Sequence, residues 1–150
     1  MNEALPCLAE PLVERLRNET YCLLNTVDAE SGGPTCTAVS WVYAVDAGTL
    51  RLAIDHRSRL VRNMKVNPLV NLTIFAEEAV HAVSGRAAVR QEPLEGVPFS
   101  MCCFDVQVEA VRNALFYGAK LDAAPTYVKT YDRRASEKLD GQVFDAMKKA

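Results

Sequence analysis

The stretch TCTAVSWVYAVDAGTLRLAIDHRSRLVRNMKVNP, residues 35–68, decides the fold. Its first part, residues 35–45, is rich in Thr, Val, Trp and Tyr, which favour extended backbone, so it predicts one long strand. The turn signal DAG at 46–48 follows, and residues 49–54 are expected to pair back on that strand as a hairpin. Consecutive strands joined by a tight turn indicate antiparallel pairing.

The second part of the same stretch predicts a short amphipathic helix. Ser58 is suited to the N-cap, where its hydroxyl can accept a hydrogen bond from the first helical turn. Leu60, Val61 and Met64 then recur at helical spacing and form an apolar stripe. The pair Asn67-Pro68 should end the helix, because a residue that precedes proline disfavours helical backbone.

Further strands and helices are predicted on both sides of this stretch. Gly85 lies inside one predicted strand and indicates a β-bulge or a close approach of two backbones. Helices are expected from Pro11 to near Asn18 and over about residues 132–149. The additional strands are expected at residues 20–28, 69–75, 79–90 and 104–111.

These elements predict a mainly β fold of the α+β type. Six strand candidates, joined mostly by turns, favour a small antiparallel barrel with helices that cap or flank it. A parallel α/β fold is not expected, because such folds separate their strands by helices. The length of 150 residues suits a single domain over residues 1–150, and the sequence contains no repeat or linker.

Composition excludes several classes of protein. A net charge of -2 and a pI near 5.7 argue against a nucleic-acid-binding domain, which is usually basic. No apolar run reaches the length of a membrane span, and no basic segment precedes an apolar run near the start, so a soluble, cytoplasmic protein is expected. The five cysteines have no zinc-type spacing and are expected to be free thiols. The adjacent Cys102-Cys103 is either redox-active or, more simply, a small apolar pair where a strand begins.

A basic cluster surrounds the predicted helix start and allows two interpretations. Backbone N–H groups at a helix start attract anions, so Ser58, Arg59 and also Arg62 could hold a phosphate. Alternatively, the cationic side chains of Arg57, Arg59, Arg62 and Lys65 form the solvated face of an amphipathic helix, with Ser58 as an ordinary cap.

The predicted strand at 35–45 has one face of mostly small residues, among them Cys36, Ala38, Ser40 and Ala44. Such a face leaves room for a flat ring to lie against the sheet. The alternative is close packing against another strand or helix. Trp41 lies on the opposite face and is expected to be an anchor in a core or an interface.

The order of these features resembles the pyridoxamine 5'-phosphate oxidase-like, flavin-binding split-barrel superfamily, over roughly residues 19–90. The resemblance implies a six-stranded antiparallel split barrel with its core at about residues 19–117, flanking short helices and the C-terminal helix. The parts that carry it are Val27-Asp28, Gly33-Pro34, Ser58-Arg59-Leu60, Asn67-Pro68 and Gly85-Arg86-Ala87.

The resemblance also implies a cofactor, flavin mononucleotide (FMN), bound at the interface of a homodimer. The flavin would exchange hydride with a nicotinamide donor or a small-molecule substrate, and the second subunit would contribute residues 80–84. Carried over by position, Ser58 and Arg59 would hold the flavin phosphate, Thr37, Ala38, Val39 and Ser40 would face the ring and ribityl chain, and Ala53, Ile54 and Asp55 would line the ribityl and phosphate side.

Two departures from the family pattern leave alternatives open. Leu60 stands where the family often has lysine, and a basic C-terminal substrate segment is not visible, so oxidation of pyridoxamine phosphate itself is not expected. The first alternative is a split barrel that binds haem or a deazaflavin, or that has lost its cofactor and acts as a binding or stress-response module. The second is a structural dimer with an empty groove.

Overall fold

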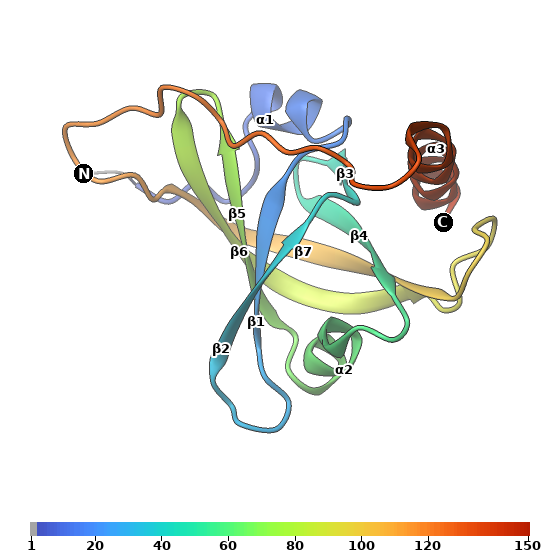
Figure 1. Cartoon of the computed structure of the whole chain (residues 1–150). Coiled ribbons are helices and arrows are strands. Elements are labelled where there is room, and N and C mark those ends of the chain that lie inside the picture. Colours follow the sequence, from blue (N-terminus) through green and yellow to red (C-terminus); the bar gives the residue numbers. More distant parts are fainter. Residues whose placement is uncertain (1–2) are drawn as a thin grey trace.

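Within residues 3–150, which the computed structural model describes, seven antiparallel strands form one sheet that curls into a split barrel (Figure 1). The first two residues of the domain expected over 1–150 lie outside the described part. The strands follow one another across the sheet in the order β2-β1-β5-β6-β7-β4-β3. Their bounds are β1 Cys22–Val27, β2 Pro34–Val39, β3 Val42–Asp46, β4 Thr49–Asp55, β5 Leu69–Ala76, β6 Ala79–Gln91 and β7 Met101–Asn113.

The expected split barrel is confirmed, but the expected strand number is wrong by one. The strand predicted over residues 35–45 is interrupted at Ser40-Trp41 and becomes β2 and β3. The reason is that its two halves have different partners: β2 pairs with β1, and β3 pairs with β4. These pairs lie at opposite ends of the sheet, so the link at Ser40-Trp41 joins its two edge strands (Figure 1).

Three helices accompany the barrel in the described residues: α1 (Glu10–Arg15), α2 (Arg59–Val66) and α3 (Arg133–Lys149). The predicted start and end of α2 are confirmed, since Ser58 Oγ accepts a hydrogen bond from the Leu60 N–H and Asn67 is extended. The C-terminal helix is confirmed to within a residue. The first helix is shorter than expected, because the carbonyl of Leu16 accepts a hydrogen bond from Ala44 in β3 instead of continuing the helix.

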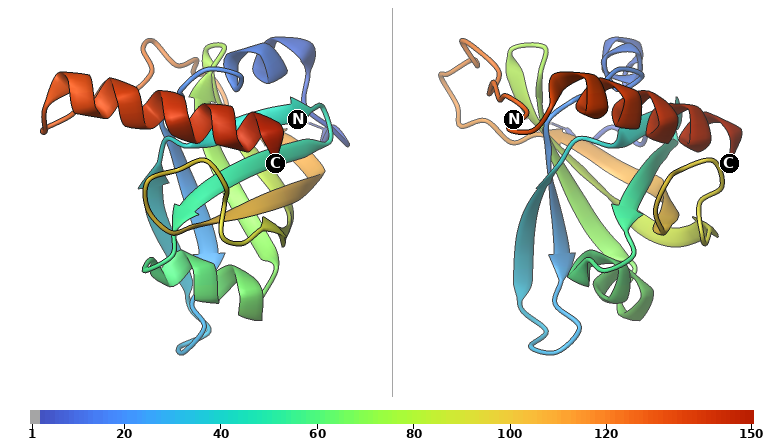
Figure 2. Two further views of the ribbon diagram at one scale, coloured as in Figure 1. Left: turned by 90° about the vertical axis from the view of Figure 1, so that its right-hand side faces the viewer. Right: turned by 45° about the vertical axis from the view of Figure 1, so that its right-hand side comes forward.

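Two apolar clusters hold these elements together. The larger fills the barrel and includes Leu24, Leu72 and Phe104. The smaller lies between the barrel wall and α3, which crosses the outside of β3 and β4 (Figure 2). Strand β4 is buried on both faces for this reason: Leu52 packs inside the barrel and Ala53 packs under α3.

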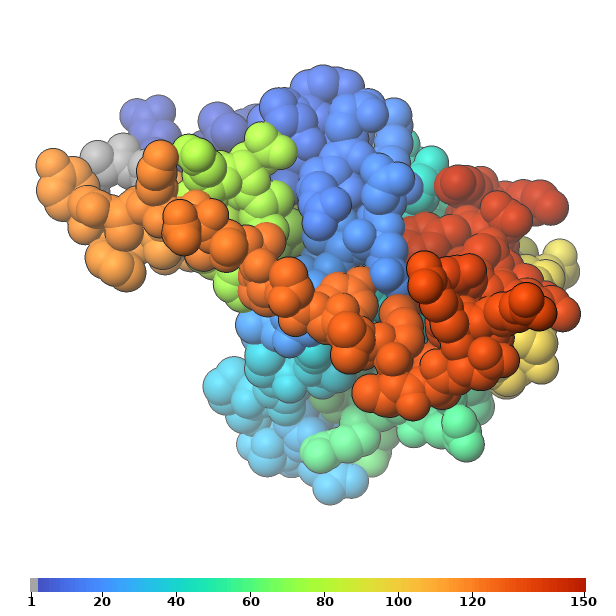
Figure 3. Space-filling model, turned by 45° about the horizontal axis from the view of Figure 1, so that its top comes forward, coloured from blue at the N-terminus to red at the C-terminus, as the bar shows by residue number. Residues whose placement is uncertain are grey.

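Residues 114–131, here called the strap, connect β7 to α3 without regular structure. Figure 3 shows the strap in orange as it crosses the top of the molecule towards α3. Its first part is held by two backbone hydrogen bonds of 2.6 Å, from the Ala114 N–H to the Val80 carbonyl and from the Leu121 N–H to the Glu78 carbonyl. No helix within residues 3–150 is long and apolar enough to cross a membrane.

Candidate cofactor-binding site

An open hollow of about 270 Å³ lies between β2, the end of β4 and the start of α2. It exists because Ser40-Trp41 crosses from one edge of the sheet to the other, where the Ala53 N–H donates to the Trp41 carbonyl at 3.2 Å. Small side chains on β2 keep the hollow open. It is lined by Thr37, Ala38, Val39, Ser40, Trp41, Ala53, Ile54, Asp55, Ser58 and Leu60.

A second hollow of about 220 Å³ continues the first along α2. It shares Thr37, Ser58 and Leu60 with the first hollow and adds Arg59, among others. The two hollows together are called the groove below. The groove therefore runs from Trp41, past the start of α2, to Arg59.

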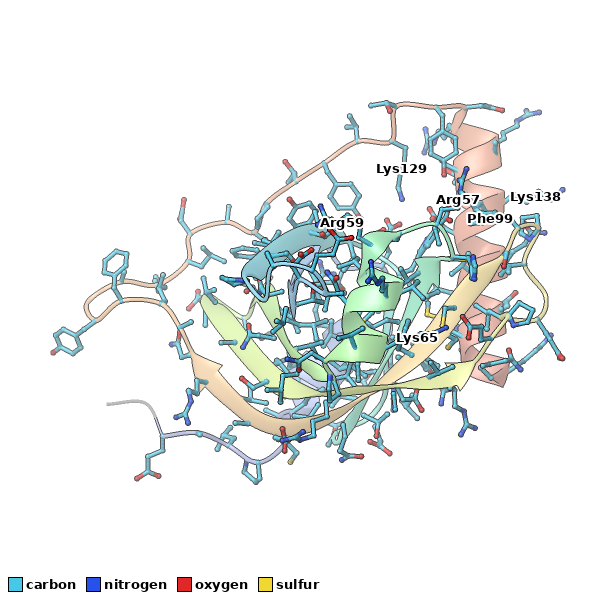
Figure 4. All side chains as sticks on the ribbon, turned by 90° about the horizontal axis from the view of Figure 1, so that it is seen from below. Arg57, Arg59, Lys65, Phe99, Lys129 and Lys138 are labelled. Atoms are coloured by element: carbon cyan, nitrogen blue, oxygen red, sulfur yellow. The ribbon has the colours of Figure 1, made fainter. Side chains whose placement is uncertain are left out.

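The sequence-predicted site residues are distributed unevenly around this groove. Thr37 to Ser40, Ala53 to Asp55, Ser58 and Arg59 all line it. Arg62 does not: it lines a neighbouring hollow, together with Asp28 and Glu30. Seen from below in Figure 4, Arg59 lies on the β2 side of α2 and Arg57 lies towards α3.

The start of α2 gives one end of the groove a positive potential. The aligned peptide dipoles of a helix leave partial positive charge at its first turn. Ser58 caps this turn, with its Oγ 3.2 Å from the Leu60 backbone nitrogen. Arg59, the first residue of the helix, adds a full charge at the same place.

Each arginine near this helix start has a carboxylate partner. Arg59 contacts Asp28 at 2.5 Å, Arg62 contacts Glu30 at 3.1 Å, and Arg57 contacts Asp55 at 3.1 Å. The cluster is thus a set of ion pairs whose guanidinium side chains are largely exposed. An anion that binds at the groove must share or displace the guanidinium of Arg59.

Asp28 is the firmly held partner in the pair with Arg59. Its carboxylate accepts hydrogen bonds from the backbone N–H groups of Ser31 and Glu30, which stabilise the turn after β1. The bond from Ser31 and, to a lesser degree, those from Glu30 and Arg59 lower its pKa to about 2. The Asp28 side chain is 7% exposed, whereas that of Arg59 is 78% exposed, so Arg59 is free to turn towards the groove.

Leu60 does not replace the family lysine as a phosphate contact. Its side chain is buried in the barrel core and also lines the groove. It therefore offers an apolar surface at the position where a lysine would place an ammonium. Arg59 is left as the cation on the groove itself among the lining residues.

Asn63 is a site-supporting residue that the sequence reasoning missed. It is buried on the apolar side of α2, where its Oδ1 accepts from the Ala29 N–H at 2.9 Å and its Nδ2 donates to Thr26 at 3.1 Å. These bonds hold the helix start against the turn that carries Asp28. The signal was an asparagine within the stripe of Leu60, Val61 and Met64, since a polar side chain on a buried face needs specific partners.

Cys102 and Cys103 lie outside the groove and are fully buried. Burial raises the pKa of Cys102 to about 12 and that of Cys103 to about 11, so both remain thiols at neutral pH. A thiol is a poor nucleophile compared with a thiolate. The simpler expectation, a small apolar pair at the start of a strand, agrees with this placement.

Residues 8–102 match the family model described as Pyridoxamine 5'-phosphate oxidase, which covers more than half of the chain. The chain belongs to the pyridoxamine 5'-phosphate oxidase family. The matched residues of this family include β2, β4 and α2, which form the groove, but neither the strap nor α3. Comparison with curated proteins gives no significant match.

Solved structures of the pyridoxamine 5'-phosphate oxidase fold resemble this chain over most of their length. One is a candidate pyridoxamine 5'-phosphate oxidase from Lactobacillus delbrueckii, with a TM-score of 0.59 and 20% identity over 71% of this chain and 98% of that chain. Another is HutZ, the haem storage protein from Vibrio cholerae, with a TM-score of 0.51 and 20% identity over 68% and 91%. A third is an F420 reductase, with a TM-score of 0.52 and 19% identity over 64% and 91%. At these identities the likeness shows the fold alone.

Proposed function

We propose that this protein binds FMN in the groove as a homodimer, and that the bound flavin exchanges hydride with a nicotinamide donor or a small-molecule substrate. One observation carries the proposal: the groove joins a face of small β2 residues to the positive start of α2. A flat ring with a phosphate at the end of a short chain needs both features, placed side by side.

The ring end of the groove suits a planar, apolar ligand. Ala38 and Ser40 leave space along β2, and Ile54 and Trp41 supply apolar surface nearby. The extended backbone of β2 has a free edge, since β2 is the first strand of the sheet and pairs only with β1 among the described strands. Its N–H and C=O groups are therefore accessible to the polar rim of a flavin ring.

The proposed dimer explains why the groove is so open. Residues Cys36, Thr37 and Ala38 are exposed although they belong to a strand. β2 is also an edge strand, and an exposed edge strand pairs readily with another chain. A second subunit that covers β2 would exclude water from the flavin ring. In this proposal, residues 80–84 of that second subunit complete the cofactor site.

The protein side of the proposed chemistry is binding and orientation. A bound flavin supplies the hydride acceptor or donor, and the chain supplies position and electrostatics. Asp55 is the titratable residue that lines the first hollow, called the ring hollow because the flavin ring would lie there. Hydrogen bonds from Arg57 lower the pKa of Asp55, so it stays a carboxylate at neutral pH. Asp55 would therefore orient polar groups of the ligand and would not donate a proton.

The names of the relatives raise haem and F420 as other ligands for this fold, and the groove offers haem a single candidate axial ligand. Iron in haem proteins takes an axial ligand such as His, Cys, Met or Tyr. Among the residues that line the groove, Cys36 alone carries such a group. A deazaflavin has the same ring shape as a flavin, so a visible absorption and fluorescence spectrum of the purified protein is the observation that separates the two.

The first prediction concerns Arg59. Arg59→Ala should weaken FMN binding about tenfold or more, because a charge-assisted hydrogen bond to the phosphate is lost. Flavin fluorescence and thermal shift during FMN titration measure the dissociation constant. Lys65→Ala is the matched control, since it removes the same charge from α2 outside the groove, where Lys65 contacts Glu92. No spectral change with wild-type protein, or equal affinity in Arg59→Ala, contradicts the proposal.

The second prediction concerns Asp28, which competes with phosphate for Arg59. Asp28→Asn should tighten FMN binding about two- to fivefold, because a partly exposed ion pair of this strength no longer restrains the guanidinium. The same titration at low ionic strength measures the change. Adding Asp28→Asn to Arg59→Ala should have little effect on affinity, because the restrained group is then absent. If Asp28→Asn binds FMN no more tightly than wild-type protein does, Arg59 does not reach the phosphate.

A further inference from the structure

Trp41 lies between the groove and the C-terminal part of the chain. The residue lines the first hollow of the groove, and its indole N–H donates to Asp140 of α3 at 2.9 Å. The ring also contacts Phe99 (labelled in Figure 4), with centroids 6.3 Å apart and planes tilted by 43°. The indole is thus held on two sides by elements outside the groove.

Asp140 is itself held in place by the strap. Its second carboxylate oxygen lies 3.3 Å from Lys129 Nζ, and Lys129 also contacts Glu19, just before β1, at 2.8 Å. Tyr127 donates its hydroxyl hydrogen to Glu19 at 2.7 Å and places its ring 5.7 Å from Lys129 Nζ. The carboxylates and the ammonium are all less than one third exposed. This network therefore joins the strap and α3 to the barrel at one point.

We propose that Asp140 is a positioning residue of the flavin site, which sets Trp41 as the wall against which the flavin ring packs. The inference rests on the proposed function and assigns a role to the C-terminal segment, which lies outside the residues 8–102 that match the family. An indole with two free torsions packs well on a planar ligand only if its orientation is restrained. The hydrogen bond to Asp140 supplies that restraint, and Lys129 holds the carboxylate in the required place.

Asp140→Ala should weaken FMN binding about five- to tenfold, the size of a lost aromatic contact. Asp140→Asn keeps an oxygen acceptor for the indole and should stay within about twofold of wild type. Trp41 is the single tryptophan of the chain, so its emission reports the indole directly. We expect a shifted emission maximum in Asp140→Ala without FMN, and quenching of Trp41 when wild-type protein binds FMN.

A Trp41→Phe background tests whether Asp140 acts through the indole. Phenylalanine has no N–H group, so adding Asp140→Ala to Trp41→Phe should change FMN affinity by less than about twofold. Glu137→Gln is the control on the same helix, since Glu137 is exposed and contacts only Arg133 in the described ion pairs. It should leave both emission and affinity unchanged.

The outcomes separate this inference from the proposed function. If wild-type protein binds FMN and Asp140→Ala binds it equally tightly, the positioning role is overturned and the proposed flavin site stands. An equal loss of affinity from Asp140→Ala with and without Trp41 also overturns it, because the effect is then a general structural one. Wild-type protein that binds no FMN overturns the proposed function and this inference together.

Discussion

Arg51→Met is expected to destabilise the protein by about 3 kcal/mol and to release α3 from the barrel. Arg51 is a buried cation on β4, with its side chain 7% exposed. It forms a two-pronged contact with Asp105 of β7, with N–O distances of 2.7 and 3.1 Å. It also donates to the carbonyl of Met147 at 2.9 Å, in the last turn of α3. Removing it leaves Asp105 without its partner and takes away the side-chain donor to the Met147 carbonyl.

Urea denaturation of wild type and variant measures this loss of stability. Arg86→Met is the matched control, because Arg86 forms an exposed pair with Glu109 across β6 and β7 and should cost less than about 1 kcal/mol. The emission of Trp41 reports the release of α3 in the same experiment, since Trp41 is bonded to that helix. An unchanged unfolding midpoint in Arg51→Met would show that the buried pair contributes nothing net.

Gly85→Ala is the second large effect, with an expected loss of about 3 kcal/mol from overpacking. Gly85 lies in β6 at the register shift next to Ser84, as the sequence predicted for a bulge or a close approach. A Cβ atom at Gly85 would collide with the carbonyl oxygen of Gln107 in β7 and lie 2.8 Å from a Val106 methyl group. The Gln107 oxygen belongs to the paired backbone of β7, so the clash cannot be relieved by a side-chain rotation.

A second glycine provides the contrasting control. Gly141 lies within α3, where an added Cβ would meet nothing within 4 Å. Gly141→Ala should therefore stabilise the protein by about 0.5–1 kcal/mol, the usual helix preference for alanine. Thermal and urea unfolding of both variants measure the difference. A Gly85→Ala protein as stable as wild type would mean that β6 and β7 can separate at this point without cost.

Local signals in the sequence predicted most elements because those signals act over a few residues. The N-cap at Ser58, the stop at Asn67-Pro68 and the DAG turn each satisfy neighbouring backbone groups, and each is present in the structure. The division of residues 35–45 into two strands could not be predicted in this way. Its side-chain alternation continues through Ser40-Trp41, and the break depends on which distant strand each half meets.

The candidate site likewise has features that short segments predict and features that depend on the tertiary structure. A small face on β2 and a capped, basic helix start are properties of short segments, so both could be predicted from the residues. Their contact across one groove depends on the crossing of the chain from one sheet edge to the other. The ion-pair partner of Arg59 could not be predicted from the sequence either, since Asp28 lies 31 positions earlier in the chain.

The sequence by itself determined most strand and helix positions, the antiparallel class and the resemblance to the family, because periodicity, caps and turn residues are local and ordered along the chain. Only the tertiary structure decided which charges neutralise one another and which side chains meet at the groove. Trp41 shows the physical reason: its hydrogen-bond partner, Asp140, lies 99 positions away on α3. Contacts of that kind depend on how the barrel closes and where the strap leads the chain, and no short pattern encodes either.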